Sequence, residues 1–133
     1  MSAAIPHPPV FVVDDEEPVR KSLSRLLGAI GVPTETYSSA TAFFASYTAE
    51  RPGCLLVDLR MPGMSGLDLI VELNRRKSVL PIIVMTGHTD ERSVQRLEAY
   101  QLLGFLEKPF SLADLRVLID RWRSALTLAA PGE

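Results

Sequence analysis

Short apolar runs alternate with amphipathic segments five times along the 133-residue chain. Residues 10–13, 54–57 and 82–85 are continuously apolar, as expected of strands that are buried on both faces of a sheet. Between the runs, apolar residues recur every three or four positions, which is typical of helices with one buried face. This alternation predicts an α/β fold, in which a five-stranded parallel sheet carries helices on both faces and the crossovers are right-handed.

Turn and capping residues set the expected boundaries of these elements. Pro18 suits the first turn of a helix, Gly31 suits its C-terminal end, and Ser39 and Ser111 suit the N-caps of two later helices. A fourth helix is expected over about residues 90–100. Strands are expected at 10–13, 34–37, 54–57, 82–85 and 105–107, of which 34–37 has the weakest pattern.

Length and composition fit a single globular domain, since 47% of the residues are hydrophobic and 23% are charged. We expect a disordered N-terminal lead-in over residues 1–9, one domain over 10–127 and a disordered tail over 128–133.

Charge and cysteine content exclude several functional classes. The net charge is −2 and no block of basic residues is present, so direct nucleic-acid binding is not expected. The single cysteine, Cys54, excludes an internal disulfide and a cysteine-based metal site, which fits a reducing compartment. No apolar stretch is long enough to span a membrane, and the N-terminus lacks the plan of a signal peptide. A cytoplasmic protein without membrane contact is expected.

Polar residues follow four of the predicted strands, at the point where each strand ends. They are Asp14-Asp15, Asp58, Thr86-Gly87 and Lys108-Pro109. Because ligands of open parallel sheets bind outside the carboxyl ends of the strands, we expect these residues to converge on one edge. Single aspartates at such turns commonly do no more than cap a strand or a helix, but four coincident polar positions favour a site.

The chemistry of this edge points to phosphoryl transfer. Two carboxylates about 4 Å apart repel each other by about 4 kcal/mol at an effective dielectric constant of 20, so Asp14, Asp15 and Asp58 must protonate or bind a cation. Oxygen donors favour a hard ion, and Mg²⁺ fits best. Lys108 adds a positive charge and Thr86 a hydroxyl donor. A carboxylate is itself a competent nucleophile toward phosphorus.

Four sequence motifs carry a family resemblance. They are residues 12–15 (VVDD), 58–66 (DLRMPGMSG), 85–88 (MTGH) and 105–110 (FLEKPF). Together they resemble the response-regulator receiver domain of two-component signalling, and most closely the receivers of FixJ/NarL-type transcription regulators. The resemblance covers about residues 10–122. It implies a flavodoxin-like (CheY-like) doubly wound sheet of order 2-1-3-4-5 with five helices.

The resemblance implies that Asp58 accepts a phosphoryl group from a phosphohistidine on a sensor histidine kinase. Asp15, Asp58 and the backbone carbonyl of Arg60 would ligate Mg²⁺ directly, and Asp14 would act largely through water. Lys108 would pair with the phosphoryl group.

The remaining implied roles concern switching. Thr86 would close onto the phosphoryl group, and Phe105 would act as the switch aromatic that moves with it. The Lys108-Pro109 peptide bond is expected to be cis. Each residue also has an ordinary alternative. Thr86 could simply end a strand, Phe105 could be a core residue, and His88 could either tune water access to the acyl phosphate or be a solvated loop residue.

The residues of this edge are compatible with more than one function. A receiver would act as a phosphorylation switch and not as an enzyme, with a phosphorylation-dependent homodimer as a possible form. Its output could be a DNA-binding domain absent from this chain, or the chain could be a stand-alone regulator. A dehalogenase-type phosphohydrolase would need a second acid where Arg60 stands. A flavin-binding module would need a hydroxyl-rich loop in place of residues 14–17, which are acidic.

Two regions depart from the family pattern. Receivers commonly have a small Ala-Gly-Ala turn before the fifth strand, whereas this chain has Tyr100-Gln101-Leu102-Leu103. Leu102 and Leu103 could enter the core or face a partner. The helix expected at 90–100 has only Val94 and Leu97 as clear apolar anchors, which predicts that it is the most mobile helix.

Overall fold

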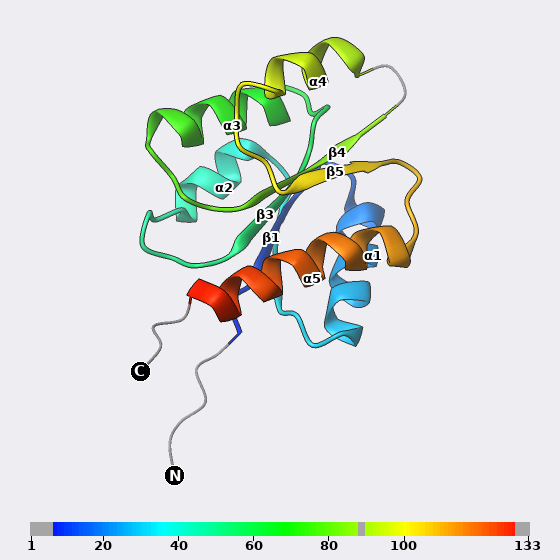
Figure 1. Cartoon of the computed structure of the whole chain (residues 1–133). Coiled ribbons are helices and arrows are strands. Elements are labelled where there is room, and N and C mark those ends of the chain that lie inside the picture. The colour runs from blue at the N-terminus through cyan, green and yellow to red at the C-terminus, as the bar shows by residue number, and fades with distance from the viewer. Residues whose placement is uncertain (1–6, 88–89, 130–133) are drawn as a thin grey trace.

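The apolar runs of the sequence form the strands of one parallel sheet (Figure 1). The computed structural model describes residues 7–87 and 90–129, with side chains as far as Leu126. The strand order is β2-β1-β3-β4-β5, and all neighbouring strands are parallel. This confirms the predicted fold class and strand order. The elements are β1 (Val10–Val13), α1 (Glu17–Ala29), β2 (Thr34–Tyr37), α2 (Ala40–Ser46), β3 (Cys54–Asp58), α3 (Gly66–Arg75), β4 (Ile82–Thr86), α4 (Glu91–Leu97), β5 (Gly104–Glu107) and α5 (Leu112–Ala129).

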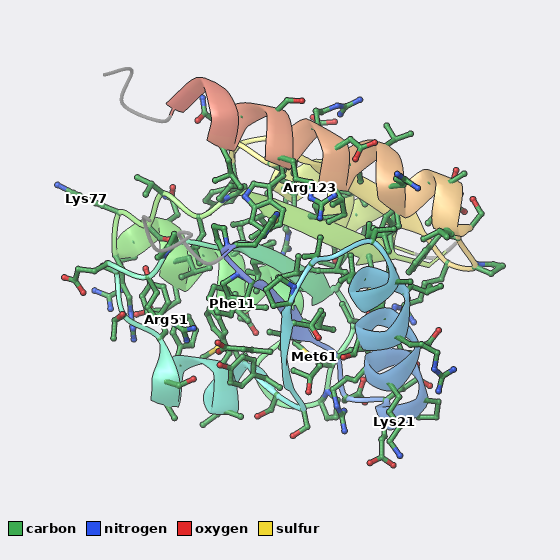
Figure 2. All side chains as sticks on the ribbon, turned by 90° about the horizontal axis from the view of Figure 1, so that it is seen from below. Phe11, Lys21, Arg51, Met61, Lys77 and Arg123 are labelled. Carbon is green, nitrogen blue, oxygen red and sulfur yellow. The ribbon has the colours of Figure 1, made fainter. Side chains whose placement is uncertain are left out.

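Helices cover both faces of the sheet and create two separate cores. Helices α1 and α5 lie on one face, whereas α2, α3 and α4 lie on the other (Figure 1). Successive side chains of a strand point to opposite faces, so Val12 and Leu56 join the core under α1 and α5, and Phe11 and Leu55 join the other. Figure 2 shows Phe11 inside the molecule and charged residues such as Lys21 and Lys77 projecting from its periphery.

The predicted caps hold the helix ends as expected. Ser39 accepts a hydrogen bond from the N–H of Ala42 (3.0 Å), and Ser111 accepts one from the N–H of Asp114 (3.1 Å). Gly31 closes α1 with a positive φ of 81°, which lets the N–H groups beyond the helix bond back to its last carbonyls.

The connection from α4 to β5 is where the structure differs most from expectation. Helix α4 ends at Leu97, so the predicted helix over residues 90–100 was too long at its C-terminal end. Leu102 and Leu103 are both half-buried and pack against opposite cores. Neither residue is fully internal, and neither projects as an exposed apolar side chain.

The chain also packs on itself close to its two ends. The His7 ring lies edge-on to Trp122, with ring centroids 5.4 Å apart, and Arg123 donates to His7 Nε2 at 3.2 Å. The last residues of the expected lead-in 1–9 therefore contact the domain, and α5 continues to Ala129, past the predicted limit of 127. Residues 1–6 and 130–133 lie outside the described residues. Within the described ranges, every helix is too short or too polar to cross a bilayer.

Candidate functional site

Three carboxylates meet where β1 and β3 end. Asp14 follows β1, Asp15 comes next, and Asp58 is the last residue of β3. Because β1 and β3 are adjacent and pair Val13 with Val57, the residues that follow are brought side by side. Each aspartate offers an oxygen within 4.8 Å of those of the other two. The predicted convergence of this cluster is confirmed.

Lys108 reaches the same cluster from the end of β5. Its Nζ lies 3.1 Å from Asp14 Oδ2 and 3.5 Å from Asp58 Oδ2, as the sequence predicted. It also lies 3.9 Å from Glu16 Oε1, a fourth carboxylate that the sequence analysis did not assign to the site. The backbone N–H of Lys108 donates to the Thr86 carbonyl (2.7 Å), and the Lys108-Pro109 peptide is cis as predicted.

Burial dominates the electrostatics of the site. It raises the pKa of Asp58 to about 6, with Asp14 adding to the rise and Lys108 opposing it. Burial also lowers the pKa of Lys108, but the charges of Asp58 and Asp14 outweigh that effect and raise it overall. Since carboxylates outnumber the ammonium here, a further positive charge would stabilise the ionised cluster.

The donor set fits a hard divalent cation. All side-chain donors of the cluster are carboxylate oxygens, and cysteine and histidine are absent from it within the described residues. Oxygen-only sites favour Mg²⁺ or Ca²⁺ over softer metals. The N–H of Arg60 donates to Asp58 Oδ1 at 3.3 Å and so helps to orient the carboxylate. Ligation by the Arg60 carbonyl stays a prediction.

Helix α3 presses directly on the backbone of Asp58. A Cβ added at Gly66, the first residue of α3, would lie 2.4 Å from the Asp58 carbonyl oxygen and 2.8 Å from Leu59 Cα. A side chain at Gly66 would therefore displace the loop that carries the carboxylate. The sequence showed this glycine as part of the 58–66 motif, but not the contact that requires it.

The two predicted switch residues lie on neighbouring strands, β4 and β5. Thr86 is the buried last residue of β4, which is adjacent to β3 and pairs Met85 with Asp58. Phe105, on β5, is 42% exposed, so its interpretation as an ordinary core residue is wrong. Movement of either residue stays a prediction, and His88 lies outside the described residues.

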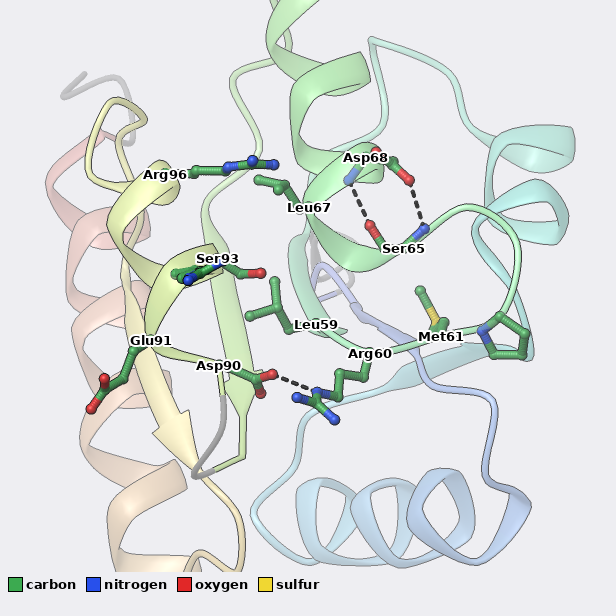
Figure 3. Close-up of a pocket in the computed structure, with 12 residues that line it drawn as sticks. Leu59, Arg60, Met61, Ser65, Leu67, Asp68, Asp90, Glu91, Ser93 and Arg96 are labelled. Atoms are coloured by element: carbon green, nitrogen blue, oxygen red, sulfur yellow. Dashed lines mark hydrogen bonds and ion pairs between the residues drawn. The ribbon is translucent and has the colours of Figure 1, made fainter.

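An ion pair beside the site was not foreseen from the sequence. Arg60 Nε lies 2.6 Å from Asp90 Oδ1 (Figure 3). The other oxygen of Asp90 accepts the N–H of Gly87 at 2.6 Å. This pair closes one end of a hollow of about 820 Å³ between α3 and α4, which Leu59, Leu67 and Arg96 help to line. The two partners are 30 residues apart in the chain. An arginine and an aspartate at that separation do not by themselves indicate that the two side chains meet.

Comparisons with known proteins agree with this geometry. A family model described as the response regulator receiver domain matches residues 10–120. The chain is 43% identical over 107 residues to the transcriptional regulatory protein FixJ of Azorhizobium caulinodans. The aligned region covers 80% of this chain and 51% of that protein. It is 42% identical over 121 residues to FixJ of Rhizobium meliloti, covering 90% of this chain and 59% of that one.

More distant relatives and solved structures extend the match. The DNA-binding transcriptional regulator NtrC of Salmonella typhimurium is 36% identical over 84% of this chain and 24% of its own length. The crystal structure of FixJ-N superimposes with a TM-score of 0.80 at 40% identity, over 88% of this chain and 94% of that one. The chain spans about half the length, or less, of these curated relatives.

Proposed function

Because the chain belongs to the response regulator receiver domain family, we propose that Asp58 is its phosphoryl acceptor and that a sensor histidine kinase is the donor. The observation that carries this proposal is the position of Asp58, which is 7% exposed at the end of a central strand, with Lys108 Nζ at 3.5 Å. This carboxylate lies at the carboxyl edge of the sheet, where Lys108 supplies a positive charge beside it.

The residues at this edge have different roles in phosphoryl transfer. Asp58, with a pKa of about 6, is ionised at neutral pH and attacks phosphorus. A bond forms between its Oδ and phosphorus while the bond from phosphorus to the donor nitrogen breaks, and the nitrogen keeps that electron pair. Lys108 stabilises the negative charge on the phosphoryl oxygens. Thr86 moves toward the phosphoryl group, and its hydroxyl donates a hydrogen bond to one of these oxygens. Phe105 moves inward together with Thr86.

Magnesium is the cation we propose for the acidic cluster. Asp15, Asp58 and the Arg60 carbonyl would hold it directly, and Asp14 would hold it largely through water. When bound, it supplies positive charge to the phosphoryl oxygens. Asp14, which is fully buried and paired with Lys108 at 3.1 Å, orients the ammonium toward Asp58.

We propose that the output is transcriptional regulation in the cytoplasm. The relatives named above are transcription regulators, and the chain matches about half of their length or less. Phosphorylation would change the surface formed by α4, β5 and α5, which exposes Phe105, Leu112 and Val117, and could promote a homodimer there. DNA binding would then belong to a segment outside these 133 residues, although action as a stand-alone regulator would use the same switch.

Intact mass measurement after incubation with acetyl phosphate tests the proposal. With Mg²⁺, the wild-type chain should gain one phosphoryl group, and chelation of the metal should abolish the gain. Asp58→Asn should gain none. Asp120→Asn is the matched control, because it removes a carboxylate from an exposed pair on α5, and it should behave as wild type. A phosphorylated Asp58→Asn variant would overturn the assignment.

A further inference from the structure

The ion pair between Arg60 and Asp90 joins two elements that both follow site-bearing strands. Arg60 lies in the loop after β3, two residues beyond Asp58, and Asp90 immediately precedes α4. Figure 3 shows the pair spanning the gap between these two segments. Arg60 therefore connects Asp58 to the start of α4, because its backbone N–H donates to Asp58 Oδ1 and its guanidinium pairs with Asp90.

The two partners differ in how firmly they are held. Asp90 is 5% exposed, and its second oxygen is fixed by the N–H of Gly87 at 2.6 Å. The Arg60 side chain is 65% exposed, so it is the partner that can rotate away. A buried carboxylate that loses its counter-charge is costly, and it regains solvation only if the structure around it opens.

Apart from the bonds between Asp90 and Gly87, the described residues show few contacts that hold the beginning of α4. The helix has seven residues, its N-cap Asp90 makes no side-chain capping bond among the described residues, and Leu97 at the far end is its buried anchor. The link to Arg60 is thus a principal restraint on the N-terminal turn of α4.

We propose that Arg60 exchanges partners on phosphorylation, leaving Asp90 for the phosphoryl group on Asp58 and thereby releasing the start of α4. The inference rests on the proposed function of Asp58. A phosphoryl group carries a charge of about −1.5 to −2 with several acceptor oxygens, so it competes well with a single carboxylate for a guanidinium. The Arg60 amide already donates to Asp58 Oδ1 at 3.3 Å, which places the root of the Arg60 side chain next to the Asp58 carboxylate. Asp90, deprived of its partner, must then be solvated, and the first turn of α4 loosens.

A double-mutant cycle on the rate of phosphorylation by acetyl phosphate tests the exchange. Asp90→Asn keeps an acceptor for Gly87 but weakens the hold on Arg60, so phosphorylation should be about 3- to 10-fold faster than in wild type. In an Arg60→Gln background, Asp90→Asn should change the rate less than about 2-fold, because no guanidinium remains to be released. Glu91→Gln, an equal loss of charge on the neighbouring residue, should leave the rate within about 2-fold of wild type.

The NMR signal of the Arg60 Nε–H provides a readout that does not depend on the rate. In wild type it should shift when beryllofluoride, a phosphoryl mimic, is added with Mg²⁺, and Asp90→Asn alone should already displace it. If Asp90→Asn does not fold, Arg60→Gln substitutes for it. Amides of α4 in that variant should exchange about 3- to 10-fold faster before phosphorylation, and modification should add little.

The possible outcomes separate the two proposals. An equal effect of Asp90→Asn in both backgrounds, or an Arg60 signal that beryllofluoride leaves unmoved, overturns the exchange while phosphorylation of Asp58 stands. A wild-type chain that gains no phosphoryl group overturns both.

Discussion

Helices α3 and α4 cover the same face of the sheet and adjoin the same site, yet they are held very differently. Helix α3 begins with a reciprocal capping box, in which Ser65 and Asp68 each accept the other's backbone N–H at 3.1 Å. It buries four residues, Gly66, Leu69, Ile70 and Leu73. Helix α4 has seven residues and buries Leu97, and its N-terminal turn is tied down by the Arg60–Asp90 pair.

This contrast indicates that α3 is part of the rigid framework of the site, whereas α4 is an element that can move. Helix α3 presses on the backbone of Asp58 through Gly66, so it must stay fixed for the carboxylate to keep its position. Helix α4 follows the strand that ends at Thr86 and has few apolar anchors, so it can shift at low cost. If α3 is framework and α4 is mobile, equivalent substitutions should cost more stability in α3 than in α4.

Removal of a buried leucine from each helix should give the largest difference. Leu73→Ala should lower the free energy of unfolding by about 3 kcal/mol, because α3 belongs to the cooperative core. Leu97→Ala should cost less than about half of that, since a weakly anchored helix can detach locally. Chemical denaturation measures both. Val71→Ala, at a position 42% exposed, is the control and should stay within about 0.5 kcal/mol of wild type. Equal costs for the two leucines would place α4 in the same cooperative unit as α3.

Neutralisation of Asp58 should show how much the buried charge of the site, which adjoins both helices, lowers the free energy of unfolding. The pKa of Asp58 in the folded protein, about 6, lies above its unfolded value of 3.8, so the folded state binds more protons between these values. Stability should therefore fall as pH rises from about 4 to 6. In metal-free buffer at pH 7.5, Asp58→Asn should raise the free energy of unfolding by about 1–2 kcal/mol and flatten that decline. A variant with unchanged stability and an unchanged pH profile would contradict the burial argument.

Loss of the capping box should weaken α3 by an intermediate amount. Ser65→Ala removes the acceptor for the Asp68 N–H and should cost about 1 kcal/mol in thermal or chemical unfolding. Ser93→Ala on α4 serves as the matched control, because Ser93 makes no cap, and should cost less than about 0.5 kcal/mol. A larger cost at Ser93 would reverse the comparison.

A substitution at the C-terminal end of α3 should change the free energy of unfolding least. Lys77 has a φ of 59°, and the N–H of Ser78 bonds back to the Leu73 carbonyl at 3.0 Å. Glycine adopts this left-handed conformation without the steric penalty of a side chain, so Lys77→Gly should raise the unfolding free energy by about 0.5 kcal/mol. Lys21→Gly, inside α1, is the opposite control and should lower it by about 1 kcal/mol. A loss of stability in Lys77→Gly would mean that the lysine side chain makes a stabilising contact there.

The sequence predicted those parts of the site that follow from strand topology. Once the strands were placed, Asp14, Asp58 and Lys108 had to meet at one edge, and the structure confirms this. Caps such as Ser39 were predictable for a similar reason, because a cap bonds to residues three positions away.

Features that depend on long-range packing could not be predicted in this way. The Arg60–Asp90 pair joins residues 30 positions apart, and Asp90 looked like an ordinary start of a helix. The C-terminal end of α4 was misplaced because residues 98–100 are compatible with a helix in composition but leave it to enter the turn before β5. Phe105 could not be assigned to core or surface until its exposure was known.

Hydrogen exchange of backbone amides before and after phosphorylation tests the central claim most directly. In wild type, modification by acetyl phosphate and Mg²⁺ should accelerate exchange in α4 several-fold and leave α3 and α1 unchanged, and Asp58→Asn should show no response. Equal protection of α3 and α4, unaltered when Asp58 carries the phosphoryl group, would contradict the account.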